Sequence, residues 1–273
     1  MSQTVDTSFI ELYDSEVKAA YQRMSSLIRG TVRTRQQVGA KRIYFPILGK
    51  GTVTRKSRHA DVVPMNLEHE RVFADMEDAY APEYIDELDQ VKINWSLRRD
   101  YAMASAAALG RETDRLIIGA MENSSNETSA AAVNDSADTS LTLPVITTLG
   151  ERLNNRDVPL DGQRFAVVSP QTHAELLRIE GATSSDFTTQ QLLTNGGAPT
   201  GPGWMGFRWV MHSGLPDGVK GFFYHQSSVG HGIARDVTST FDWVPQKVAW
   251  LVNSYMSMGA VLIDPDGVEI LTS

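Results

Sequence analysis

The sequence predicts an α+β protein, with long elements in its first half and shorter, alternating elements in its second half. Two runs rich in aromatic and branched residues, 42–48 (RIYFPIL) and 66–76 (NLEHERVFADM), flank a stretch with two glycines and a proline and predict a long hairpin. A proline-free run over 89–121 predicts a long helix. From residue 141 onwards helical and extended patterns alternate, and the last third is rich in strands.

The N-terminal segment predicts an amphipathic helix over 8–30. Ser8 and Glu11 have the spacing of a capping box, in which each side chain satisfies the other's free backbone N–H. Gly30 can adopt the left-handed conformation that ends a helix. Between them, apolar residues recur at steps of three and four and so share one face: Phe9, Leu12, Tyr13, Val17, Tyr21, Met24 and Ile28.

The hairpin and the long helix are both larger than a compact domain of this size needs. An isolated two-stranded hairpin is marginally stable in water, so a projection over 41–88 has to lie against the chain's own core or against a neighbouring molecule. A helix over 89–121 spans roughly 50 Å. Its apolar residues line one narrow face, and Gly110 predicts a bend.

The remaining segments predict a second, mixed unit. Residues 122–140 are polar, of low complexity and without periodicity, which predicts a linker and a domain boundary. Beyond it we expect a helix over 144–155, a buried strand RFAVVS, a helix that Pro170 begins, and a loop rich in glycine and proline over 195–206. Asp266 and Gly267 predict a turn before the last strand.

Composition excludes several kinds of chemistry. The 273 residues contain no cysteine, so disulfides, thiolate metal sites and a cysteine nucleophile are impossible. No run approaches the ~20 apolar residues of a membrane span, and we expect a soluble cytosolic protein. The stretch GKGT at 49–52 lacks the spacing and the following helix of a phosphate loop, and the six histidines form no His-Glu-x-x-His pair. We therefore expect no enzyme activity, no cofactor and no metal.

Charge is segregated along the chain. Residues 17–60 contain eleven Lys or Arg and no acid, although the whole chain has a net charge of −8. The rest therefore carries −19, and ten of its acids fall within 61–90. Three interpretations compete for 17–60: a nucleic-acid patch, a phosphate cradle, or a segment that reaches an acidic surface of another copy. The acidic second half of the same hairpin weakens any continuous basic face for nucleic acid.

Several stretches, in order, resemble the major capsid proteins of tailed double-stranded-DNA bacteriophages, whose fold is shared with encapsulin shells. Residues 84–121 are similar to the spine helix of that family with its lead-in. Residues 154–177 resemble its Val-Pro, strand and Pro-initiated helix, 201–216 and 221–237 the strands that follow, and 255–271 the closing segment. Each motif alone is degenerate, but the ordered set covers most of the chain.

The resemblance implies a tailed-phage major capsid fold: an N-terminal arm, a long β-hairpin extended loop, a peripheral domain with a long spine helix, and an axial α/β domain. It divides the chain into an arm with its helix (1–40), the extended loop (41–88), the peripheral domain with the spine helix (89–140), the axial domain (141–226), return strands of the peripheral domain (227–259) and a closing axial strand (260–273). The implied function is a structural subunit that forms the hexamers and pentamers of an icosahedral shell around phage DNA. The alternatives are an encapsulin-type shell around a cargo enzyme and, in a different class, a nucleic-acid-binding protein that uses 17–60.

In this family the extended loop lies across the adjacent subunit, so we expect basic residues of the loop to meet acids of a neighbour. The candidate contact residues are Lys50, Arg55, Lys56, Arg58, Glu68, Glu70, Asp75, Glu77, Asp78, Glu83, Asp86, Glu87 and Asp89. Lys50 and Lys56 resemble crosslinking lysines of some members, but no catalytic acid is identifiable and we predict no crosslinks.

The resemblance also implies partners and a location. The main partner is the chain itself. Further candidates are a separate scaffolding protein, a portal complex at one vertex, a decoration protein, and packaged DNA contacted non-specifically on the inner face. The expected location is the virion capsid, with the host cytoplasm during assembly and no membrane.

Overall fold

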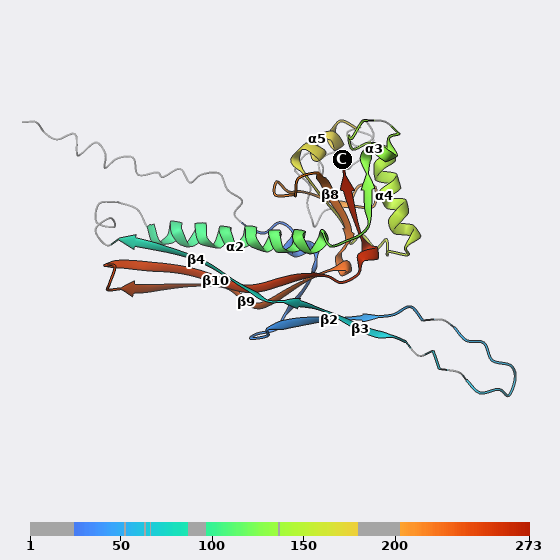
Figure 1. Ribbon diagram of the computed structural model, residues 1–273, viewed down its shortest axis with the longest axis horizontal. Coiled ribbons are helices and arrows are strands. Elements are labelled where there is room, and N and C mark those ends of the chain that lie inside the picture. The colour runs from blue at the N-terminus through green and yellow to red at the C-terminus, as the bar shows by residue number, and fades with distance from the viewer. Residues whose placement is uncertain are drawn as a thin grey trace, which may run out of the picture.

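The computed structural model describes residues 25–51, 53–62, 64–65, 67–86, 97–135, 137–179 and 203–273. The predicted N-terminal helix up to residue 24, the first eight residues of the predicted long helix and most of the loop rich in glycine and proline lie outside these ranges. Within them the chain forms a long layered body and a separate α/β unit, joined where α2 ends (Figure 1).

The long body is built on a four-stranded sheet in the order β1-β9-β10-β4. β1 runs parallel to β9, and the other pairs are antiparallel. The bounds are β1 Arg33–Gln36, β4 Glu77–Asp86, β9 Val229–Val244 and β10 Ala249–Leu262. Helix α2 (Leu97–Met121) covers one face of this sheet, where Leu109 packs with Ile233, Met256 and Met258. The predicted long helix is thus confirmed from residue 97 onwards.

Gly110 has a different role from the predicted bend. α2 runs without interruption from Leu97 to Met121. A Cβ on Gly110 would lie 3.0 Å from the amide nitrogen of Ser26 and 3.2 Å from the Cα of Ser25. The missing side chain therefore lets the chain at 25–26 cross close over the helix.

The hairpin packs against the opposite face of the sheet (Figure 1). β2 (Arg42–Leu48) and β3 (His69–Asp75) pair antiparallel, with Arg42 opposite Asp75. Alternate residues of the pair, Ile43, Phe45 and Ala74, are buried in a cluster with Ile263. A two-residue period puts these side chains on one face, and that face meets the sheet.

Glycines on the sheet make this close packing possible. A Cβ on Gly259 of β10 would lie 2.0 Å from the carbonyl oxygen of Asp75, and one on Gly230 would lie 2.9 Å from the ring of Phe45. Both distances are shorter than non-bonded contacts allow, so only glycine fits here.

The hairpin is shorter than the predicted span of 41–88. Its pairing ends at Asp75, and after Met76 the chain continues as β4, which pairs with β10 along its whole length. β4 therefore belongs to the larger sheet. The sequence shows one extended, acidic run here, and only the pairing partners reveal that it forms two strands in two sheets.

The second unit is a five-stranded sheet in the order β5-β11-β8-β6-β7, flanked by helices. Its elements are β5 Glu127–Ser129, α3 Ala130–Val133, α4 Leu143–Asn155, β6 Arg164–Val168, α5 Pro170–Leu177, β7 Arg208–Met211, β8 Val219–His225 and β11 Val268–Thr272. α4 and α5 pack on one face around an aromatic and aliphatic core that includes Leu149, Phe207, Trp209 and Phe223.

Most predicted elements of this unit are confirmed. The helix predicted over 144–155 occupies 143–155, the strand RFAVVS includes β6, and Pro170 begins α5 after the cap Ser169. Asp266 and Gly267 lie in the short turn Pro265–Gly267 between β10 and β11.

The linker predicted over 122–140 is wrong in part. It contains β5, which pairs parallel to β11, and the short helix α3, which the hydroxyl of Ser129 caps. A strand of three residues has too few positions to show a periodic signal, so its partner strand decides its structure. Among the described helices, none is long and apolar enough to cross a membrane.

Candidate inter-subunit interface

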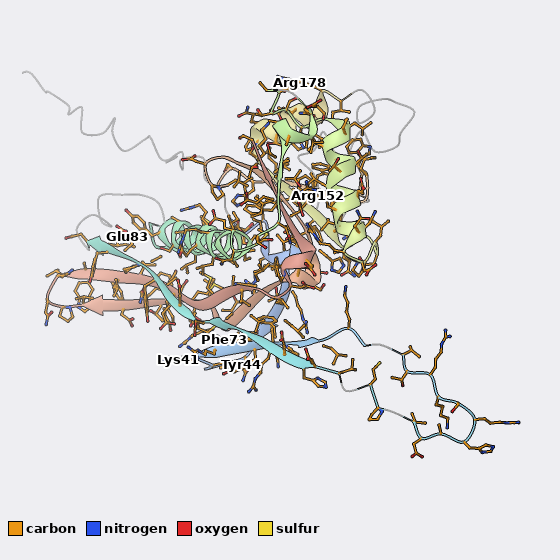
Figure 2. The ribbon with its side chains drawn as sticks, turned by 45° about the vertical axis from the view of Figure 1, so that its right-hand side comes forward. Lys41, Tyr44, Phe73, Glu83, Arg152 and Arg178 are labelled. Atoms are coloured by element: carbon orange, nitrogen blue, oxygen red, sulfur yellow. The ribbon has the colours of Figure 1, made fainter. Side chains whose placement is uncertain are left out.

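The basic tip of the extended loop lies far from the folded body. Arg55, Lys56 and Arg58 are exposed in the connection between β2 and β3, beyond the last paired residues Leu48 and His69. In Figure 2 this connection extends away from both sheets. Within the described part of the chain, these three cations make no ion pair. They are available to an external partner.

The acidic residues of β4 extend from the base of the hairpin, at Glu77 and Asp78, to the other end of the molecule, at Glu83 and Asp86. Glu77, Asp78, Glu83 and Asp86 are exposed on this strand, which is an edge of the four-stranded sheet. β4 runs away from the loop and ends at the opposite extremity of the body (Figures 1 and 2, with Glu83 labelled in Figure 2). The basic tip and the acidic strand of one subunit therefore cannot meet each other.

Other predicted contact residues lie between these extremes. Lys50 Nζ lies 3.7 Å from Asp157 Oδ2 of the same chain, with both side chains more than four-fifths exposed. Asp75 accepts a hydrogen bond from Arg42 Nε at 2.6 Å within the hairpin. Glu68 and Glu70 are exposed near the loop. Glu87 and Asp89 fall outside the described residues.

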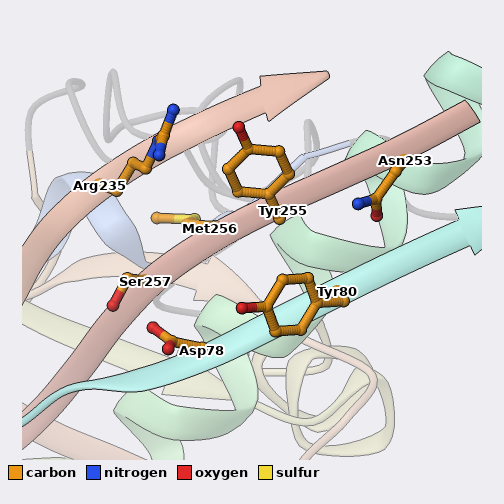
Figure 3. Close-up of a pocket in the computed structure, with 7 residues that line it drawn as sticks. All are labelled: Asp78, Tyr80, Arg235, Asn253, Tyr255, Met256 and Ser257. Atoms are coloured by element: carbon orange, nitrogen blue, oxygen red, sulfur yellow. The ribbon is translucent and has the colours of Figure 1, made fainter. Parts of the chain in front are cut away.

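The sheet face that holds the hairpin is hollowed beside it. A cavity of about 240 Å³ is lined by Asp78, Tyr80, Arg235, Asn253, Tyr255, Met256 and Ser257 (Figure 3). The guanidinium of Arg235 lies 4.7 Å from the ring centroid of Tyr255, which lies 6.2 Å from that of Tyr80. A neighbouring cavity of about 730 Å³ shares Asp78 and Arg235 and reaches the turn at 38–41. Together they form a polar and aromatic groove along the sheet.

Sequence reasoning did not find this groove. Its residues come from β4, β9 and β10, and the alternation of Tyr255 and Ser257 with buried methionines was the only local signal of a second exposed face. The pairing of Tyr80 with Tyr255 and of Asp78 with Ser257 creates the site.

A buried polar junction ties the N-terminal chain to both units. Asp114 of α2 is fully buried and accepts hydrogen bonds from the Ser26 hydroxyl, the Leu27 amide (3.2 Å) and the Ile28 amide (3.3 Å). Asp114 Oδ2, which accepts from Leu27, also lies 3.2 Å from His212 Nε2. Because the amide of Gly214 donates to His212 Nδ1, Nε2 carries the proton and donates to Asp114.

The electrostatics of this junction favour an ionised Asp114. Burial by itself raises the pKa of this carboxyl, but the hydrogen bonds from His212, Ser26 and the two amides outweigh burial and hold the pKa below its usual value. The junction thus places a negative charge where residues 26–28, α2 and the end of β7 meet.

A second buried carboxylate strengthens the α/β unit. Glu269 of β11 is fully buried and accepts a hydrogen bond from Thr128 at 2.6 Å. Arg152 and Arg156 of α4 lie 3.0 and 2.7 Å from its oxygens. This network holds α4 against β11 and β5.

The fold matches known capsid subunits. The cyanophage P-SCSP1u capsid structure superposes with a TM-score of 0.73 at 15% identity, covering 95% of this chain and 91% of that chain. The structure from Mycobacterium phage Che8 gives 0.70 at 18%, covering 95% of both chains. A virus-like particle from Pyrococcus furiosus gives 0.59 at 10%, covering 91% and 92%. No curated protein matches the sequence.

These likenesses show that the chain has the fold of tailed-phage capsid proteins. A sequence family described as "Phage capsid protein" matches residues 5–272, so the chain belongs to this family. It is a major capsid subunit of an icosahedral shell and a component of the virion capsid. The predicted fold class and function are confirmed, and the encapsulin alternative is not favoured.

Proposed function

We propose that the subunit forms hexamers and pentamers that enclose a double-stranded DNA genome, and that each basic loop tip lies against the acidic sheet end of a neighbour. The observation that carries this proposal is the placement of the two charges at opposite ends of one subunit. Such a subunit is self-complementary only toward another copy. A head-to-tail contact of this kind generates a ring when the rotation closes.

The proposed contact contributes to assembly because it is repeated many times in the shell. A single exposed ion pair contributes only about 0–1 kcal/mol. Repetition around each ring and across the shell multiplies that small term, while its weakness leaves early contacts reversible. The charges also set the register of the loop on its neighbour, because like charges brought together by a shifted register repel.

Reversal of the three loop cations tests the contact. We expect the triple variant Arg55→Glu, Lys56→Glu and Arg58→Glu to give a folded subunit that assembles poorly, because its tip repels the acidic strand. The measurement is the shell fraction by sedimentation and electron microscopy, with circular dichroism as the check on folding. Arg178→Glu, on the exposed end of α5, is the control and should assemble normally.

A charge swap sharpens this test. Adding Glu83→Lys and Asp86→Lys, at the far end of β4, to the triple variant restores opposite charges across the proposed contact. Recovery of shells by this combined variant supports the contact. Normal assembly of the loop variant alone would show that the basic tip is not an inter-subunit clamp.

The structure weakens the nucleic-acid alternative for residues 17–60. Arg29 pairs with Asp236, Arg42 pairs with Asp75, and Arg33 lies over the ring of Phe45. From residue 25 onwards, where the structure describes this segment, its cations are thus divided among several surfaces and do not form a continuous phosphate-binding stripe. We propose that packaged DNA meets the inner face of the assembled shell non-specifically, and that the subunit has no enzyme activity.

We further propose a separate scaffolding protein, a portal complex at one vertex, a decoration protein and assembly in the host cytoplasm, which are the partners and the place that a tailed-phage shell uses. Co-expression of the subunit with candidate scaffolding proteins, followed by electron microscopy and by measurement of nucleic acid in the particles, tests these proposals. Uniform closed shells only in the presence of the second protein support a separate scaffold. Uniform shells from the subunit alone would contradict it.

A further inference from the structure

His231 is an unusual buried histidine. It lies on β9 with no exposed surface, and within the described part of the chain neither ring nitrogen has a hydrogen-bond partner. Its cross-strand neighbours are Thr34 of β1 and Ala260 of β10, neither of which titrates. A buried polar group without a partner costs free energy, so this position calls for an explanation beyond packing.

The charged groups that act on His231 also hold the chain at residues 25–31, which we name the arm root. Arg29 of the arm root, Asp236 of β9 and Asp114 of α2 all act electrostatically on the imidazole. Arg29 binds both carboxylate oxygens of Asp236, at 2.9 and 3.2 Å. Asp114 binds the amides of 27 and 28. Both carboxylates near His231 therefore fasten the arm root.

The remaining titratable neighbours are attached to the same network. His212 donates to Asp114, and the Tyr224 hydroxyl is hydrogen-bonded to Thr31 in the arm root. Burial raises the pKa of Tyr224 far above its usual value, so this phenol stays neutral. Arg33 and Arg35 of β1 pair with positions 230 and 232, on the opposite face of the sheet from His231.

A proton on His231 would disturb this arrangement directly. The imidazolium would be buried without an acceptor and repelled by the positive charge of Arg29. Burial first, and Arg29 second, lower the pKa of His231 to about 4, while Asp236 and Asp114 oppose this shift. If Asp236 or Asp114 turned to accept from the protonated ring, that carboxylate would leave the arm root that it holds.

We propose that His231 is an acid-operated release for the arm root: proton uptake on this ring repels Arg29 and competes for Asp236 and Asp114, so that residues 25–31 separate from α2 and β9 while both sheets stay folded. The release would free the segment that connects residues 1–24 to the rest of the chain.

The direction of the pH dependence follows from the two protonation states. In the closed state His231 is neutral down to pH about 4, whereas an exposed histidine binds a proton below about 6.5. The closed state is therefore fully favoured above about pH 6.5 and loses its advantage as pH falls toward 4. Between these values the open fraction rises by up to about tenfold per pH unit.

The absence of cysteine allows a clean test in the full chain. Ser25→Cys, labelled with an environment-sensitive fluorophore, reports on the arm root, and far-ultraviolet circular dichroism reports on the sheets. We expect the fluorescence to change between pH 6.5 and 4 with the dichroism constant, and to stay constant when His231→Gln or His231→Leu is added. His173→Gln, at a buried histidine of α5, is the matched control and should keep the transition.

Three outcomes would overturn the proposal: a transition that persists in both His231 variants, no change above pH 4 in the unsubstituted background, or a change that occurs only together with loss of dichroism. If the variants do not fold, nuclear magnetic resonance titration of the His231 imidazole in the unsubstituted chain gives the answer. A midpoint well below 6, with a concurrent loss of amide protection at 26–31, supports the release. A midpoint at or above 6, or unchanged protection, contradicts it.

Discussion

Replacement of Asp114 by alanine is expected to lower the free energy of unfolding by about 3–5 kcal/mol, the usual cost of removing one member of a buried charged network. The substitution leaves two backbone amides, the Ser26 hydroxyl and the His212 Nε2–H buried without their acceptor. It also detaches residues 26–28 from α2. Urea-induced unfolding of the unassembled subunit measures the loss.

The matched control lies on the same helix. Glu112 pairs with Arg115 at the surface, with a nitrogen–oxygen distance of 2.9 Å. Glu112→Ala should cost less than about 1 kcal/mol, because water replaces an exposed partner. If Asp114→Ala changed stability no more than this control, the junction would not carry the attachment of the N-terminal chain.

The pH dependence of this junction differs from that of His231. The pKa of Asp114 lies below its ordinary value of 3.8, so its contribution to stability is fully present above that value and is lost as pH falls through the lowered pKa. At pH 5 Asp114 therefore stays ionised, so protonation of this carboxyl does not explain a loosening of the arm root seen there.

Gly259→Ala is expected to displace the hairpin and to cost about 3 kcal/mol or more, at the upper end of what overpacking costs. The new methyl group would lie 2.0 Å from the carbonyl oxygen of Asp75. Since that atom belongs to the backbone, no side-chain rotation relieves the clash. The hairpin must lift from the sheet, which exposes Ile43 and Phe45. Shell formation should fail, because the loop tip then leaves its proposed position.

Gly119→Ala, in helix α2 of the same subunit, is expected to be tolerated, in contrast to Gly259→Ala. A Cβ at this position of α2 meets nothing within 4 Å. Alanine is about 1 kcal/mol better than glycine inside a helix, so this variant should unfold at a slightly higher temperature and assemble normally. Thermal unfolding and electron microscopy of both variants separate a steric effect from a general intolerance of glycine replacement. A Gly259→Ala protein that assembles normally would contradict the close-packing argument.

The success of sequence reasoning varied with the range of the interactions involved. Pro170 and its cap Ser169 start α5, and the alternation of Ile43 and Phe45 with exposed residues marks a strand, because these preferences act within a few residues. β5 escaped prediction because three residues show no period. The division between β3 and β4 escaped it because both strands have extended backbones and differ only in their partners.

At the candidate interface, too, some features are visible in the sequence and others only in the folded structure. The separation of basic from acidic segments is visible in the chain, and so is the order of motifs that resembles capsid proteins. The positions of those charges at opposite ends of the subunit are not visible there. They follow from β4 leaving the hairpin and pairing with β10.

Local pattern and composition thus establish the elements, the exclusion of cysteine chemistry and the family. The three-dimensional packing alone establishes the groove, the glycine contacts and the buried junction. Asp114 meets residues 26–28 and His212, which lie 86 to 98 positions away in the chain. Contacts over such separations depend on how whole elements pack against one another, and no pattern within a few residues of Asp114 records which partners that packing will bring.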